Sequence, residues 1–161
     1  MIEVYTGAGK GKTTAAVGLA IRALGAGLRV YMMQFMKSLA YSEQKILQGF
    51  SPQLALHTTG KPFFIAKEGM LTEEERKAWG EDVVVFPGGK PPADYRHLMQ
   101  QGFGKAAEAA RSDAWDVVIL DEINVALFFD LVSREEVESL LDDVPPEREL
   151  VLTGRNAPSW L

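Results

Sequence analysis

The run Thr6-Gly7-Ala8-Gly9-Lys10-Gly11-Lys12-Thr13-Thr14 combines glycines, lysines and hydroxyl side chains. Glycines let successive backbone N–H groups turn inward around phosphate oxygens, and a lysine neutralises phosphate charge. We therefore interpret this run as a phosphate-binding loop, with Lys12 on the phosphates and Thr13 able to hold Mg²⁺. The usual pattern has glycine where this chain has Thr6, so an ordinary glycine-rich turn is the alternative. The candidate nucleotide contacts are Gly7, Ala8, Gly9, Lys10, Gly11, Lys12, Thr13 and Thr14.

A second candidate site follows the apolar run from Val117 to Leu120, where two carboxylates, Asp121 and Glu122, come in succession. At the carboxyl end of a parallel strand such side chains reach the ligand-binding edge of the sheet, where they can coordinate Mg²⁺. Taken alone, the pair fits a solvated strand end equally well. Together with the loop, it predicts a metal site formed by Thr13, Asp121 and Glu122.

A third candidate is Arg155 in the run Thr153-Gly154-Arg155, which follows a segment typical of a strand. An arginine at a strand end can bind phosphate oxygens with two parallel N–H groups. A surface arginine without a ligand is the alternative.

The segments between these motifs alternate between strand and helix patterns. The helix predicted from Lys12 to Leu24 has almost no polar face, so we expect it to be largely buried. The stretch 38–92 is less regular. The alternation predicts an α/β fold with a mostly parallel, doubly wound sheet and helices on both faces, like that of P-loop NTPases, as a single nucleotide-binding domain over residues 1–161. The other predicted elements are strands 2–5, 28–35, 116–121 and 148–153, a helix 93–111 and a helix that begins at Ser133.

Composition excludes several classes of protein. The chain has 161 residues and a net charge of −5, which argues against a basic nucleic-acid-binding surface. Residues 1–37 carry five basic residues and one acidic residue, a balance of +4 that favours a small polyanionic ligand. Apolar runs are too short to span a membrane, and cysteine is absent. Because the start lacks the pattern of a secretory signal, we expect a cytoplasmic protein.

Taken together, these motifs resemble those of the P-loop ATP:corrinoid adenosyltransferases. The loop region from Tyr5 to Ala16 is similar to the phosphate loop of that family, which usually has asparagine where this chain has Ala8. The ordered set covers most of the chain. The further similar segments are Arg22-Ala23 with Gly25 and Gly27, Gln34-Phe35-Met36-Lys37 with Glu43, Leu120-Asp121-Glu122-Ile123, and Thr153-Gly154-Arg155 with Ala157-Pro158.

This resemblance implies transfer of the 5′-deoxyadenosyl group from ATP to reduced cob(I)alamin or a related corrinoid, with release of tripolyphosphate. It implies Lys12 and Arg155 as catalytic residues, and Arg22 and Phe63 as further cofactor-binding residues. Phe63 would crowd the lower face of the corrin ring. Mg²⁺ is the implied metal, and the implied partners are a second copy of the chain in a homodimer and a flavin-type reductase.

Two alternatives stay open. One is a P-loop kinase that phosphorylates a small molecule. The other is a shortened, non-catalytic homologue that binds ATP or a corrinoid. Two features keep the second open: the chain stops at Leu161, and Ile65 stands where the family has tryptophan. A further departure from the family is that Glu3 to Tyr5 already belong to the first strand, so we expect no corrinoid-covering segment there. Phe63 and Phe64 equally fit plain core residues.

Overall fold

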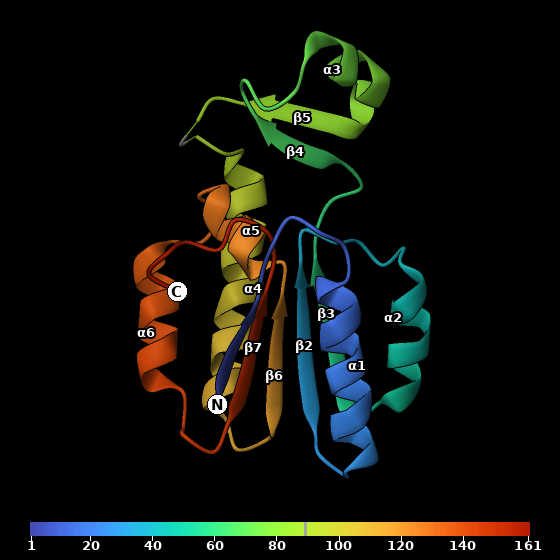
Figure 1. The fold of residues 1–161 in the computed structure, drawn as a ribbon, viewed down its shortest axis with the longest axis vertical. Coiled ribbons are helices and arrows are strands. Elements are labelled where there is room, and N and C mark those ends of the chain that lie inside the picture. Colours follow the sequence, from blue (N-terminus) through green and yellow to red (C-terminus); the bar gives the residue numbers. More distant parts are fainter. Residues whose placement is uncertain (89) are drawn as a thin grey trace.

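A five-stranded parallel sheet forms the centre of the molecule in a computed structural model that describes residues 1–88 and 90–161 (Figure 1). The strand order is β1-β7-β6-β2-β3, so the first strand lies at one edge. Every neighbouring pair in this sheet is parallel, which brings all five carboxyl ends to the same edge. The strands are β1 (Ile2–Tyr5), β2 (Val30–Phe35), β3 (Leu54–Thr59), β6 (Val117–Asp121) and β7 (Glu149–Thr153).

Helices cover both faces of this sheet, which confirms the predicted α/β architecture. One face packs against α1 (Lys12–Gly25) and α2 (Ser42–Leu47). The other face carries the larger core and packs against α4 (Ala93–Arg111), α5 (Ile123–Phe128) and α6 (Arg134–Asp143). In the part of the chain that the structure describes, no helix combines the length and apolar character needed to cross a membrane.

Local sequence signals account for most element bounds. The predicted helix from Ala93 to Arg111 is α4, and Ser133 caps α6 by accepting the N–H of Glu136 while the Glu136 side chain accepts the N–H of Ser133. All six residues of β2 and all five of β6 are buried, as expected for strands covered on both faces. Strand β2 begins at Val30, two residues later than predicted.

The expectation that the first helix is largely buried is wrong. Only four of its residues are buried, and all of them face the sheet: Ala16, Ala20, Ala23 and Leu24. Ile21 on the other side is 40% exposed. The helix lies in the outer layer over β6 and β7, so a single stripe of it can contact the strands. Val17 and Leu19 are partly buried against the same core, whereas Ala15 faces outward with Ile21.

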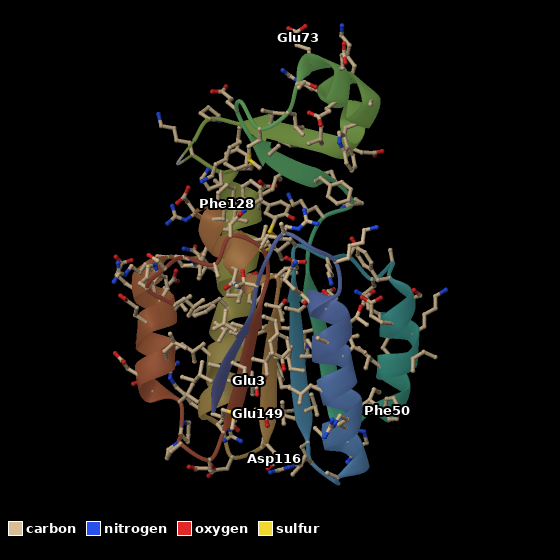
Figure 2. All side chains as sticks on the ribbon, viewed as in Figure 1. Glu3, Phe50, Glu73, Asp116, Phe128 and Glu149 are labelled. Atoms are coloured by element: carbon tan, nitrogen blue, oxygen red, sulfur yellow. The ribbon has the colours of Figure 1, made fainter. Side chains whose placement is uncertain are left out.

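The irregular stretch of the sequence contains a second, two-stranded parallel sheet. It is formed by β4 (Phe64–Lys67) and β5 (Val83–Phe86) with α3 (Glu73–Trp79) and the short 3₁₀ turn η2 (Gly80–Asp82) between them. A further 3₁₀ turn, η1 (Gln48–Phe50), follows α2. Figure 1 shows β4, β5 and α3 above the end of the central sheet where its strands finish. The Lys67 ammonium lies 4.7 Å from the ring centroid of Phe128 in α5, below the small sheet (Figure 2).

Gly102 in α4 is required by a close approach to the edge strand. A Cβ atom at this position would lie 2.3 Å from Cγ2 of Thr59, a buried side chain of β3. Thr59 is branched at Cβ, so its χ1 has little freedom to move aside. Gly104, two residues further along, has open space around it.

We predict opposite effects of alanine at these two glycines. Gly102→Ala should lower the free energy of unfolding by about 1–3 kcal/mol through overpacking, although alanine favours a helix. Gly104→Ala should raise it by up to about 1 kcal/mol through helix propensity alone. Urea unfolding followed by circular dichroism measures both. Equal effects of the two substitutions would contradict this account of α4 packing.

Candidate functional site

Four strands of the central sheet bring their carboxyl ends to one site. The predicted phosphate loop follows β1, Lys37 follows β2 closely, Asp121 ends β6, and Thr153 ends β7. Because the strands are parallel, these groups meet at the upper edge in Figure 1. Three labelled carboxylate residues, Glu3, Asp116 and Glu149, lie at the opposite edge (Figure 2).

The loop between β1 and α1 is open to solvent and turns at glycine. Gly7 and Gly11 have φ of 121° and 110°, a backbone conformation that other residues rarely adopt. The Lys12 side chain folds back over the loop, where its ammonium donates to the carbonyl of Gly7 at 2.8 Å and to that of Gly9 at 2.6 Å. The predicted cation of the loop is therefore held at the rim of an exposed turn, as phosphate binding requires.

The Asp121 carboxylate is fully buried and accepts four side-chain hydrogen bonds. Its Oδ1 accepts from Thr13 at 2.9 Å and from Thr153 at 2.7 Å. Its Oδ2 accepts from Gln34 at 3.0 Å and from Lys37 at 2.7 Å. The structure thus brings Thr13 of the loop to Asp121, and it joins both to residues from two further strand ends.

Sequence reasoning did not assign Gln34, Lys37 or Thr153 to the site. The signal for Gln34 in the sequence is a polar residue within an otherwise apolar strand, which the structure shows to be fully buried. A buried polar residue needs a hydrogen-bond partner. Lys37 stood only within the motif Gln34-Phe35-Met36-Lys37, quoted for the family resemblance, and Thr153 stood in the run that ends in Arg155 without a role of its own. Their partnership with Asp121 depends on which strands are neighbours, which the sequence pattern does not state.

Glu122 is the N-cap residue of α5 and has a left-handed backbone conformation, with φ of 66°. Burial raises the pKa of its carboxyl group, and the neighbouring Asp121 charge raises it further. The charges of Lys37, Lys12 and Arg155 oppose that rise. These three cations therefore lie close enough to act on one carboxylate.

The oxygen atoms around Thr13 suit a hard cation such as Mg²⁺. A hydroxyl and two carboxylates are the ligand types that Mg²⁺ prefers, and phosphates usually complete its shell. The Lys37 ammonium lies 3.1 Å from Thr13 Oγ1 and 2.7 Å from Asp121 Oδ2, so this position already attracts positive charge. Within residues 1–88 and 90–161 no group of three or more His, Cys, Asp or Glu side chains could hold a metal alone. The donors present fit a metal shared with a phosphate ligand.

An apolar cavity of about 230 Å³ borders the same cluster. Its lining includes the charged Lys37 and Glu122 together with the apolar and aromatic Phe63, Ile65 and Tyr95. The Phe63 ring is partly buried and packs against the Tyr95 ring with centroids 5.8 Å apart. Phe63 is therefore a cavity wall and not a fully buried core residue, whereas Phe64 beside it is 53% exposed.

The two predicted arginines lie in different places. Arg155 follows β7 directly, is exposed, and acts on Glu122 electrostatically. Arg22 lies in the last turn of α1, ten residues after Lys12, which places it about 15 Å further along the helix. The structure brings Arg155 close enough to act on Glu122, and it does not bring Arg22 there.

Removing the Thr153 hydroxyl should destabilise the protein. This oxygen accepts the Glu122 N–H at 3.0 Å and donates to Asp121, so Thr153→Val leaves two buried groups short of a partner. We expect a loss of about 2–3 kcal/mol in the free energy of unfolding, measured by urea denaturation without metal. Thr58→Val on the partly exposed edge strand is the matched control and should change it by less than about 0.5 kcal/mol. A neutral Thr153→Val would contradict the buried network.

Known proteins are similar to this chain over almost its whole length. Residues 1–161 match the family described as ATP:corrinoid adenosyltransferase BtuR/CobO/CobP. Two similar proteins are named corrinoid adenosyltransferase. The one from Sinorhizobium sp is 32% identical over 160 residues, covering 98% of this chain and 64% of the relative. The one from Escherichia coli (strain K12) is 29% identical over 156 residues, covering 96% and 67%.

A third similar protein, the uncharacterized protein all2391 of Nostoc sp. (strain PCC 7120), is 31% identical over 167 residues, covering 99% of this chain and 40% of the relative. This chain thus spans between 40% and 67% of the length of these three relatives. The family match extends from the first residue to the last, over the loop, the carboxylates and the strand ends described above. The chain therefore belongs to the ATP:corrinoid adenosyltransferase family BtuR/CobO/CobP.

Proposed function

We propose that this chain transfers the 5′-deoxyadenosyl group of ATP to cob(I)alamin or a related corrinoid and releases tripolyphosphate. One observation carries the proposal beyond family membership. Lys37 contacts both Thr13 of the phosphate loop and Asp121, and together with Glu122 it also lines an apolar cavity. A site of this form suits a polyanionic substrate on one side and a large, largely apolar substrate on the other.

The proposed reaction requires little covalent chemistry from the protein. The lone pair of the reduced cobalt attacks C5′ of ATP, a cobalt–carbon bond forms, and the C5′–O bond breaks with its electrons passing to the triphosphate. The corrinoid is itself the nucleophile, so no serine or cysteine is needed. The protein must align C5′ with the cobalt and stabilise the departing negative charge.

The proposed roles follow from charge and position. Lys12 and the loop N–H groups from Gly7 to Thr14 bind the phosphates, and Arg155 stabilises the leaving triphosphate. Thr13, Asp121 and Glu122 would hold Mg²⁺, which supplies further neutralisation of phosphate charge when bound. The ribose points toward the cavity, where Phe63 packs against the lower corrin face.

Two partner proposals rest on the family resemblance alone. A homodimer is tested by light scattering on the purified chain across a range of concentrations. A flavin-type reductase as electron donor is tested by replacing chemical reductant with a reduced flavoprotein in the assay below.

The decisive experiment is an anoxic incubation of the protein with Mg-ATP and chemically reduced cob(I)alamin. We expect adenosylcobalamin in the visible spectrum and tripolyphosphate as the inorganic product. ADP as the product would instead identify a kinase. ATP binding without any turnover would identify a non-catalytic binding protein.

Lys12→Ala should abolish turnover in this assay. It removes the ammonium at the loop rim, and we expect at least a 10²-fold loss of kcat/KM, the usual order for removal of one group that stabilises developing charge. Lys45→Ala on exposed α2 is the control and should keep full activity. Near-normal turnover by the Lys12 variant would refute the assignment of the phosphate site.

Arg155→Ala should lower kcat by about 10- to 10²-fold and leave the fold intact, because Arg155 is exposed at a strand end. The rate is measured in the same assay, and thermal unfolding checks the fold. Arg111→Ala removes a surface arginine paired with Asp143 and serves as the matched control. An unfolded Arg155 variant with a folded control would make Arg155 a structural residue.

A further inference from the structure

Lys37 is held rigidly at the boundary between the cation position and the apolar cavity. The preceding residue, Met36, has φ of 58°, a strained conformation that turns the chain sharply after β2. Gly60 packs against the backbone of Lys37, since a Cβ atom on Gly60 would lie 2.5 Å from the Lys37 carbonyl carbon. The Lys37 side chain is 11% exposed. Its backbone is thus fixed, and only its side chain can change partners.

The ammonium of Lys37 contacts the same oxygens that would hold a divalent cation. It donates to Asp121 Oδ2 at 2.7 Å and to Thr13 Oγ1 at 3.1 Å. Two cations cannot share these oxygens at close range, because like charges repel strongly where water is excluded. Binding of a metal there therefore requires the ammonium to leave.

A second partner for the ammonium lies near Tyr41, a residue that lines the cavity. Glu43 Oε1 lies 4.0 Å from Lys37 Nζ, and the Tyr41 ring centroid lies 5.4 Å from it. Gln44 anchors this segment by donating to Gln34 Oε1 at 2.8 Å and to the Ser38 carbonyl at 3.0 Å. A small rotation of the lysine side chain can thus exchange Asp121 for Glu43.

We propose that Lys37 is a tethered cation that a divalent metal displaces from Thr13 and Asp121, and that the displaced ammonium pairs with Glu43, close to Tyr41 in the wall of the apolar cavity. The inference rests on the metal site of the proposed function and not on the transfer reaction. Loading the metal thereby moves the positive charge of Lys37 away from the buried carboxylate and toward Glu43 and Tyr41. The buried Asp121 carboxylate keeps a cationic partner in both states, which avoids an unpaired buried charge.

The test is a titration with Mn²⁺, followed by electron paramagnetic resonance, with tripolyphosphate at the same fixed concentration in every sample and no corrinoid present. The Lys37 ammonium competes with the metal, so the apparent affinity for Mn²⁺ is reduced to the fraction of time that the site is free. If the ammonium occupies the site about nine-tenths of the time, Lys37→Met should bind Mn²⁺ about tenfold more tightly than the wild type. Lys45→Met, a neighbouring exposed lysine, should leave the affinity unchanged. Asp121→Asn should abolish binding.

Substitution of Glu43 provides a second, separate test of the proposal. Glu43→Gln should weaken Mn²⁺ binding several-fold in the wild-type background, because the displaced ammonium then lacks its partner, and it should have a clearly smaller effect in the Lys37→Met background. Glu43→Gln by itself keeps Lys37 on Asp121, so where Lys37→Met fails to fold, this single variant tests the proposal, and unchanged Mn²⁺ binding by it would overturn the proposal.

Unchanged or weaker Mn²⁺ binding by folded Lys37→Met would overturn the proposal. So would a Glu43 effect of equal size in both backgrounds, or no Mn²⁺ binding by any of these proteins. Failure of adenosyl transfer with these Mn²⁺ results intact would refute the proposed reaction alone.

Discussion

The site depends on one buried negative charge, the carboxylate of Asp121. Burial of an ionised carboxylate is costly unless it is paired and fully hydrogen-bonded. The register of the sheet supplies the partners: Gln34 of β2 lies directly beside Asp121, and Leu152 pairs with Leu120, so Thr153 reaches the same carboxylate from the other side. A shift of one residue in either strand would turn those side chains to the opposite face of the sheet. The core packing that fixes the register therefore also fixes the site.

Backbone strain gathers at the same edge of the sheet. Outside glycine, positive φ occurs at Met36, Glu122, Asp130 and Asn156 among the residues that the structure describes. Two of these lie at the cation position: Met36 directs the chain into Lys37, and Glu122 carries a candidate ligand. Each such residue costs about 1–3 kcal/mol. The fully buried strands β2 and β6 that precede these two turns offset that cost.

Part of the fold and of the candidate site was predictable from short stretches of sequence. The glycine-rich loop, the apolar run before Asp121 and the capping box at Ser133 each lie within a short stretch of sequence, so their structures follow from neighbouring residues. Partnerships across the sheet do not. Gln34 and Lys37 joined Asp121 because β2 lies beside β6, and the outward face of α1 depends on which side of the helix meets the strands. Residues 38–92 gave weak periodicity because β4 and β5 have only four residues each.

The two sheets contribute different kinds of surface to the candidate site. The central sheet presents charged and hydrogen-bonding groups on residues fixed by buried strands, which suits the fixed geometry of phosphate and a hard cation. Phe63 and the small sheet face that edge with an apolar wall, held by side-chain contacts such as the Phe86 and Phe129 rings, 5.9 Å apart. Apolar contact is non-directional, so side chains of several shapes could form this wall. Hydrogen bonds and charges need a fixed geometry, so the phosphate side of the site depends on the exact register of the sheet, whereas the apolar side does not.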